Sequence, residues 1–367
     1  MLDSPEKIKA NEQKVNLEDL LEITVGRSAS DLHLLVGTHP TIRVDGRLIP
    51  LDEYPILTQN LAEKLIFTMI SEEQKEIFLK EKELDLSIAL GDEARFRVNL
   101  FYQRGTMGAA LRLIPRKIRT LQELGLPIIC EEFTKTSQGF VLVTGPTGHG
   151  KSTTLAAMVE SINEEKPYHI ITVEDPIEYV HTSKKSVVDQ REMHLDTYSW
   201  SIALRSVLRE DPDVILIGEM RDLETIASAI TIAETGHLVF ATLHTNNAAQ
   251  TVDRIIDVFP PRQQPQIRMQ LAGSLLGVVS QRLIPKIGGG RAVAAEVMVA
   301  TPAIRNTIRE GKTHQINNII QISADKGMTS IDKSLSSLVR NGEILFEDAR
   351  PYAIDGTYFE KLARGIH

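Results

Sequence analysis

The sequence predicts an α/β protein in which a buried parallel sheet forms the larger domain and a smaller α+β domain precedes it. From residue 140 onwards, nearly all-apolar strand-like runs alternate with helical patterns, as in a parallel sheet that helices cover on both faces. Before residue 115, strands and helices occur without strict alternation, which is typical of an α+β domain. A chain of 367 residues is long enough for two such domains.

The first domain is expected to cover residues 15–114. Residues 1–14 are a polar lead-in without the apolar stretch of a signal peptide. Apolar residues at helical spacing predict a helix over residues 56–81. Residues 41–51 predict a hairpin with its turn at Asp45-Gly46, and further strands are expected over 84–90, 94–103 and 107–114, around Gly91-Asp92 and Arg104-Gly105.

Residues 115–127, PRKIRTLQELGLP, begin and end with proline and carry three basic residues close together. We interpret them as a linker; the alternative is a surface loop within one domain. The second domain then covers residues 128–367. Its strands and helices are expected to alternate as residues 140–144, 151–163, 169–174, 199–210, 214–219, 222–234 and 238–244, and the part beyond about residue 250 is expected to be mostly helical.

Composition and charge argue against several classes of protein. A net charge of −8 disfavours a surface dedicated to DNA or RNA. The single cysteine, Cys130, allows no intrachain disulfide and indicates a reducing compartment. Apolar runs such as LLGVVS at 275–280 are too short to span a membrane. We therefore expect a cytoplasmic protein with no transmembrane segment and no nucleic-acid partner.

Residues 145–153, GPTGHGKST, fit the phosphate-loop pattern G-x-x-x-x-G-K-[ST]. An apolar strand precedes them and a helix follows, as this motif requires. Backbone N–H groups of the loop would surround a β-phosphate, Lys151 would reach the β- and γ-phosphates, and Thr153 would lie near the α-phosphate. Ser152 would bind Mg²⁺. The alternative is a glycine-rich turn without a ligand. The nucleotide contacts are therefore assigned to Gly145, Pro146, Thr147, Gly148, His149, Gly150, Lys151, Ser152 and Thr153.

Acidic residues follow two of the predicted parallel strands. Glu219 ends VILIGE, and because ligands of such a sheet bind outside its carboxyl ends, we expect it to hold Mg²⁺ through water. ITVEDPIEYVH places Glu174, Asp175 and Glu178 within five residues. Crowded carboxylates repel one another unless a metal or proton separates them. We favour Glu178 for deprotonating an attacking water and place Glu174 and Asp175 nearer the metal. The alternative for each is a solvated acid.

His244 ends the predicted strand 238–244, where it could sense the γ-phosphate. The alternative, for His244 as for His237, is a histidine that is merely hydrogen-bonded at a strand end. Strict alternation places Arg95 and Arg97 on one face of strand 94–103, and Arg112 points away from its apolar neighbours. If these strands pair through Arg104-Gly105, three guanidiniums share a polar face that suits phosphate oxygens. The alternative is a solvated arginine face.

With these segments in place, the chain resembles the secretion-type hexameric ATPases from about residue 15 to its end. Among them it resembles the type IV pilus retraction (twitching motility, PilT-like) ATPases. GPTGHGKST is similar to their Walker A motif, ITVEDPIEYVH to the Asp box, DPDVILIGEMRD to Walker B and TGHLVFATLHTNNA to the His box. AIRNTIREGKTHQI at 303–316 resembles the C-terminal motif of the retraction branch. Assembly and secretion relatives usually carry a four-cysteine zinc insertion, which a single cysteine excludes.

The resemblance implies a PAS-like N-terminal domain joined to a RecA-like P-loop ATPase domain, in a homohexamer that binds ATP and Mg²⁺ between subunits. It makes Glu178 the general base, Glu219 the Walker B acid and His244 a link between nucleotide state and subunit contacts. Arg97 and Arg112 would reach the γ-phosphate of a neighbouring subunit. The family more commonly has a small residue at position 149. Because backbone N–H groups act there, a side chain can project outward without disturbing phosphate binding. We expect His149 to be a spectator; the alternative is that it touches the nucleotide or a neighbouring subunit.

The implied function is a motor that hydrolyses ATP to retract type IV pili and thereby drives twitching motility. Implied partners are a pilus platform protein of the inner membrane and a paralogous motor ATPase, met at the cytoplasmic base of the pilus. Two alternatives stay open: another RecA-like motor (a pilus-assembly or secretion ATPase, or a DNA translocase) and a non-hydrolysing regulatory subunit. The acidic composition disfavours a DNA-facing pore, and intact Lys151, Glu178 and Glu219 count against the regulatory subunit. Arg305 and Arg309 are four residues apart on one helix face, either as a solvated stripe or as a segment needed for retraction.

Overall fold

The computed structural model describes residues 15–27, 29–44, 46–91, 94–114 and 117–365, and it divides the chain into two compact units, Met1–Lys117 and Ile118–His367. The predicted lead-in, Asp45 and Asp92 of two predicted turns, and the first two linker residues lie outside the described residues. Within the described ranges, no helix has both the length and the apolar content needed to cross a bilayer.

The first unit is built on an antiparallel sheet with the strand order β3-β2-β1-β6-β5-β4. The predicted strands and their pairing in hairpins are confirmed. Arg104 and Gly105 both have positive φ, 48° and 80°, as a type I′ hairpin turn requires. The strands are β1 (Asp31–Leu35), β2 (Thr41–Val44), β3 (Arg47–Pro50), β4 (Glu83–Leu90), β5 (Ala94–Gln103) and β6 (Thr106–Ile114).

The prediction of a continuous helix over 56–81 is wrong, because two helices occupy that range. Ser71 interrupts it: its side chain accepts from Gln74 N, and the Gln74 side chain accepts from Ser71 N. This capping box begins a new helix and ends the old one a few residues earlier. The helices of this unit are α2 (Leu17–Gly26), α3 (Gln59–Phe67) and α4 (Glu72–Glu81), and their apolar sides join the core of the unit.

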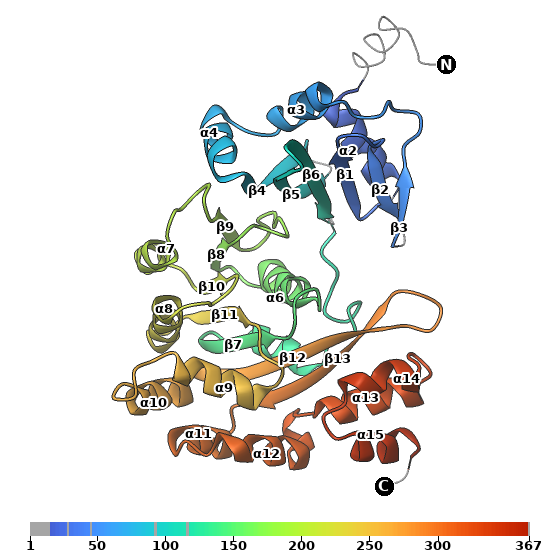
Figure 1. The fold of residues 1–367 in the computed structure, drawn as a ribbon. Coiled ribbons are helices and arrows are strands. Elements are labelled where there is room, and N and C mark those ends of the chain that lie inside the picture. The colour runs from blue at the N-terminus through green and yellow to red at the C-terminus, as the bar shows by residue number, and fades with distance from the viewer. Residues whose placement is uncertain (1–14, 28, 45, 92–93, 115–116, 366–367) are drawn as a thin grey trace, which may run out of the picture. The chain divides into compact units, whose positions relative to one another are not determined.

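The second unit contains a seven-stranded sheet with the order β13-β12-β7-β11-β10-β8-β9 (Figure 1). The expected parallel sheet is confirmed, since every neighbouring pair from β12 to β9 is parallel and only β13 runs antiparallel to its neighbour. The strands are β7 (Gly139–Thr144), β8 (His169–Glu174), β9 (Val187–Glu192), β10 (Val214–Ile217), β11 (Leu238–Leu243), β12 (Leu275–Pro285) and β13 (Arg291–Val299).

The expectation of a mostly helical region beyond residue 250 is wrong for β12 and β13, and β9 was not predicted either. β9 reads VVDQRE, too polar for a buried strand, because it lies at the edge of the sheet. β13 reads RAVAAEVMV, in which alanine favours helix. Its pairing with β12 along the whole strand outweighs that local preference.

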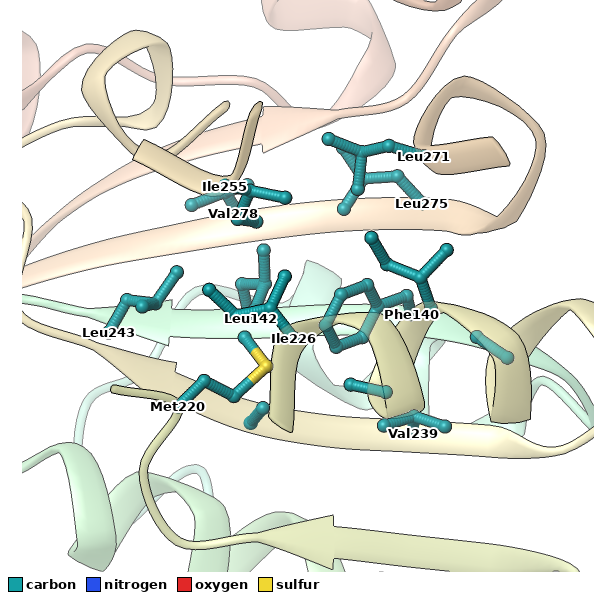
Figure 2. Packing of buried hydrophobic residues seen from close by; sticks show 14 of the residues in the cluster. Phe140, Leu142, Met220, Ile226, Val239, Leu243, Ile255, Leu271, Leu275 and Val278 are labelled. Carbon is teal, nitrogen blue, oxygen red and sulfur yellow. The ribbon is translucent and has the colours of Figure 1, made fainter. Parts of the chain in front are cut away.

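Helices cover both faces of this sheet, as Figure 1 shows for α6 and α8. Alternate residues of β7 face the two layers: Phe140 and Leu142 pack towards α8, and Val141 and Val143 towards α6. Figure 2 shows Phe140 and Leu142 among side chains such as Ile226. One face carries α5 (Ile129–Lys135) and α6 (Lys151–Glu165); the other carries α7 (Trp200–Val207), α8 (Leu223–Glu234), α9 (Ala248–Asp257) and α10 (Gln264–Ser274).

The C-terminal helices extend these layers. α11 (Pro302–Arg309) and α12 (Ile316–Ile322) add to the α8 side, while α13 (Ile331–Arg340), α14 (Phe346–Ala349) and α15 (Gly356–Ala363) pack on β12 and β13. Short 3₁₀ turns lie between them: η1 (Thr313–Gln315), η2 (Ala324–Lys326) and η3 (Arg350–Tyr352).

The predicted linker ends inside the second unit. Leu121 and Leu126 are buried in its core beside α5. The boundary between the two units, after Lys117, therefore lies near the beginning of PRKIRTLQELGLP. A hinge in this segment remains a prediction.

Candidate functional site

Four parallel strands bring the predicted chemical groups to one edge of the second sheet. β7, β11, β10 and β8 lie side by side in parallel, so their carboxyl ends meet. The phosphate loop follows β7, and Glu178, Glu219 and His244 follow β8, β10 and β11. This is the edge where open α/β sheets bind ligands.

The phosphate loop joins β7 directly to the first turn of α6. Gly145, Gly148 and Gly150 have positive φ, and α6 begins at Lys151, with Ser152 and Thr153 in its first turn. Lys151 is buried, and its Nζ donates to Gly145 O at 2.9 Å and Pro146 O at 3.0 Å. Burial lowers the pKa of Lys151, while the charges of Glu219 and Glu178 act against that shift. The lysine is thus held in the loop by carbonyl oxygens that phosphate oxygens could replace.

His244 connects the loop to the acid that ends β10. Its Nε2 lies 3.2 Å from Glu219 Oε1, and its Nδ1 lies 3.4 Å from Lys151 Nζ and 3.5 Å from Thr147 Oγ1. Glu219 also accepts from Arg221 at 2.8 Å. Burial opposes ionisation of Glu219, but the bond from Arg221 and the charge of His244 lower its pKa below 4.5. An ionised acid, a histidine and the loop lysine therefore form one connected group.

The segment after β8 lies against the same loop. The charge of Glu178 acts on Lys151, which places the proposed base near the phosphate loop. Next to it, Tyr179 shares a hydrogen bond of 2.8 Å with Thr153. The Glu174 carboxylate instead accepts from Thr172 and Gln190, and burial raises its pKa.

A largely buried contact between His181 and Glu160 holds this segment on α6. His181 Nδ1 lies 2.6 Å from Glu160 Oε2, and the two side chains are 3% and 15% exposed. Lys184 Nζ binds the other oxygen of Glu160 at 2.7 Å. Burial alone would raise the pKa of Glu160, but the bonds to His181 and Lys184 lower it to about 2. The pair positions the chain that carries Glu178.

Glu160→Gln is expected to lower the free energy of unfolding at neutral pH by about 2 kcal/mol, because it removes the carboxylate that His181 and Lys184 bind. The folded-state pKa of Glu160 is depressed below 4.5, so its contribution is present above that value and is lost as the pH falls towards 2. Urea unfolding at several pH values measures the difference. Glu164→Gln is the matched control, since Glu164 binds the same Lys184 from an exposed position. A Glu160→Gln penalty no larger than the control's would contradict the assignment.

Residues of β12 and β13 that support the phosphate loop were not predicted from the sequence. Gln281 donates to His149 O at 2.6 Å, Arg291 donates to Gly148 O at 3.2 Å, and Arg282 donates to Asn246 in the His box at 3.0 Å. The apolar run LLGVVS followed by the polar pair Gln281-Arg282 is the same strand-end pattern that revealed Glu219. If β12 had been predicted as a parallel strand, Gln281 and Arg282 would have been predicted to lie at the same sheet edge.

His237 and His149 make different contacts. His237 Nδ1 contacts Thr235 and Ile232 O at the end of α8, which corresponds to the structural alternative. The His149 side chain is half-buried and makes contacts of its own, while its expected spectator role stays a prediction. Its Nδ1 accepts from Leu283 N at 3.0 Å, and its ring packs edge-on to Tyr352 with 6.2 Å between centroids.

The predicted arginine face is present on the first unit. Arg97 of β5 and Arg112 of β6 are direct cross-strand partners, and Arg95 lies two residues from Arg97 on the same face. Arg95 donates to Ser87 Oγ at 2.6 Å. Arg112 Nε donates to Asp31 Oδ1 at 3.0 Å, although the Arg112 side chain remains 73% exposed. Asp31 is a member of this face that the sequence did not single out.

The C-terminal motif is partly structural. Ile304 and Ile308 of α11 are buried in the core. Arg305 is not part of a solvated stripe, because its guanidinium donates to Ala272 O and Gly273 O at the end of α10 and to Ala300 O after β13. Arg309 remains exposed. A role of this motif in retraction therefore stays a prediction that concerns its exposed side.

Comparison with known proteins agrees with this geometry. The family model described as "Type II/IV secretion system protein" matches residues 13–289. The type IV pilus retraction ATPase PilT of Pseudomonas aeruginosa is 50% identical over 92% of this chain and 98% of its own length. A twitching motility protein of Neisseria gonorrhoeae is 49% identical over 85% of this chain and 83% of its own. A crystal structure of the pilus retraction motor PilT with bound ADP has a TM-score of 0.89 and 46% identity, covering 95% of this chain and all of that one.

Proposed function

Because the chain belongs to the type II/IV secretion system protein family and is an ATPase, we propose that it is a motor that retracts type IV pili and thereby drives twitching motility. The observation that carries this proposal is likeness over nearly the whole length to a pilus retraction motor whose structure holds ADP. The connected group formed by Lys151, Glu219 and His244 at the sheet edge supports hydrolysis rather than nucleotide binding alone.

The residues of the site have distinct roles in the proposed reaction. Nζ of Lys151 exchanges the carbonyls of Gly145 and Pro146 for phosphate oxygens. N–H groups of Gly145, of residues 147–150 and of the start of α6 bind the phosphates. Glu178 takes a proton from the attacking water. His244 contacts both the loop and Glu219, so it responds when the γ-phosphate leaves.

The donors at the site fit Mg²⁺. Ser152 and Glu219 offer oxygen atoms, which this ion prefers, and it commonly takes its remaining ligands from phosphate and water. Both Glu219 oxygens are already engaged, by His244 and Arg221, which favours contact through water. When bound, Mg²⁺ neutralises charge on the β- and γ-phosphates.

We further propose that the chain acts as a homohexamer with its nucleotide sites between subunits. Arg97 and Arg112 then supply guanidiniums to a neighbour's γ-phosphate. Release of that phosphate lets an N-terminal domain shift at the 115–127 hinge. The movement is passed to a platform protein of the inner membrane, with a paralogous motor ATPase as a further partner at the cytoplasmic base of the pilus.

Deletion of the gene in a piliated host tests the function. We expect abundant extended pili and loss of surface motility, with retraction restored by the wild-type gene but not by a Lys151→Ala copy. Surface pili are counted by microscopy, and spreading is measured on agar. Loss of all pili would instead indicate an assembly ATPase. Normal pili and motility, together with ATP hydrolysis stimulated by DNA, would indicate a translocase.

A further inference from the structure

β12 continues beyond the strand that lies beside it. The register of β7 with β12 ends where Thr144 faces Ser280, whereas β12 continues to Pro285 and stays paired with β13. We call residues Gln281–Pro285 the β12 extension. The phosphate loop lies along it: a Cβ on Gly145 would come within 2.5 Å of Gln281 O, so only glycine permits this approach.

His149 binds the β12 extension through two different groups. Its backbone oxygen accepts from Gln281 Nε2 at 2.6 Å, and its imidazole Nδ1 accepts from the backbone N–H of Leu283 at 3.0 Å. Gln281 in turn accepts from Thr154 Oγ1 of α6 at 2.9 Å. The bond from Gln281 would survive any side chain at position 149. The bond from Leu283 needs an acceptor at the position of Nδ1.

The imidazole can accept that bond only while Nδ1 carries no proton, so the neutral ring has its proton on Nε2. The groups around the ring disfavour a second proton. Burial, followed by the charges of Arg282, Arg291 and Lys151, lowers the pKa of His149 below 6.5. Tyr352 of η3 packs against the ring from the C-terminal side. At neutral pH the Leu283 bond is intact, and in acid a second N–H would face the N–H of Leu283.

We propose that His149 is a positioning residue for phosphate binding, whose neutral imidazole holds residues 148–150 on the β12 extension before nucleotide arrives. Preorganisation of this kind increases affinity because less ordering is needed on binding. A second consequence is that phosphate affinity becomes sensitive to mild acid. The inference rests on the proposed function in one respect, which is that the ligand of the loop is a nucleoside diphosphate or triphosphate.

Affinity for ADP, measured by calorimetry on the full-length protein, tests the positioning role. At about pH 7.5, His149→Ser is expected to weaken ADP binding about tenfold, because Leu283 N–H loses its partner. His149→Asn should stay within about threefold of wild type, since its Oδ1 can take the place of Nδ1 as acceptor. Wild-type affinity for His149→Ser, or equal weakness of both variants, would overturn the proposal.

The pH dependence separates positioning from a merely structural role. Between about pH 7.5 and 5.5, wild type is expected to lose about fivefold more ADP affinity than His149→Asn, which carries no titrating group at this position. Protonation of ADP and of other side chains is common to both proteins and cancels in the comparison. Parallel pH profiles would overturn the proposal.

Hydrogen exchange of the Leu283 amide gives a readout without ligand. It should be slow in wild type and in His149→Asn, and faster in His149→Ser. If a variant fails to fold, wild type alone is compared at the two pH values after correction for intrinsic exchange, and unchanged protection contradicts the proposal. If the deletion experiment shows no role in pilus retraction, the ADP-binding and hydrogen-exchange results still test the role of His149. A wild type that binds no ADP would remove the proposed function but not the Leu283 test.

Discussion

Glu178→Gln is expected to lower ATP turnover by a factor of about 10² to 10⁴ while changing ADP affinity by less than about twofold. Glutamine keeps the size of the side chain but cannot take a proton from water. The carboxylate is close enough for its charge to act on Lys151 of the phosphate loop. Steady-state phosphate release and ADP calorimetry on the same preparation measure the two quantities.

The control for Glu178→Gln is Glu164→Gln, the same chemical change on the exposed side of the same unit. Its turnover should stay near that of wild type. Normal turnover by a folded Glu178→Gln protein would reject Glu178 as the base. Glu174 would then be the next candidate for the base. Burial raises the pKa of Glu174, and its carboxylate accepts from Thr172 and Gln190.

Arg97→Ala is expected to lower turnover about 10³-fold, a loss typical of an arginine that stabilises phosphoryl transfer in trans. Arg97 lies opposite Arg112, so the change removes half of a guanidinium pair while the apolar side of β5 stays in place. Arg47→Ala, at an exposed position on the edge strand β3 of the same unit, is the control and should be nearly silent.

Mixing two inactive variants tests whether Arg97 acts on a neighbour. In rings assembled from equal amounts of Arg97→Ala and Glu178→Gln subunits, about a quarter of the interfaces combine an intact Arg97 with an intact Glu178 from different subunits. Turnover should therefore recover well above that of either variant alone. No recovery in rings shown to be mixed would mean that Arg97 acts within its own subunit or not at all. Turnover by a strictly monomeric wild type would reject the shared site.

The sequence predicted which groups meet at the sheet edge, because their positions depend on chain order. A phosphate loop, an acid and a histidine each follow an apolar strand, and parallel strands necessarily bring such ends together, as they do for Lys151, Glu219 and His244. The arginine face was also accessible, because alternation along β5 and β6 depends only on the two-residue period of a strand.

Contacts between distant segments could not be predicted from the order of motifs or from periodicity. The helix expected over 56–81 is divided by a capping box that a longer apolar periodicity concealed. The sequence did not show β12 as a strand. For that reason it also did not show the roles of Gln281 and Arg282, or the bond from Leu283 to His149, which joins residues 134 positions apart. No local period encodes which strand lies beside β7.

The sequence by itself determined the fold class, the family resemblance and the residue types expected to act on a nucleotide, since these follow from motifs and short-range periodicity. Only the tertiary structure decided what supports the phosphate loop. A residue that looked like a spectator binds the β12 extension, because β12 continues past the end of β7 and presents a backbone N–H there. A partly buried donor of this kind favours an acceptor, and packing brings the imidazole of His149 to it.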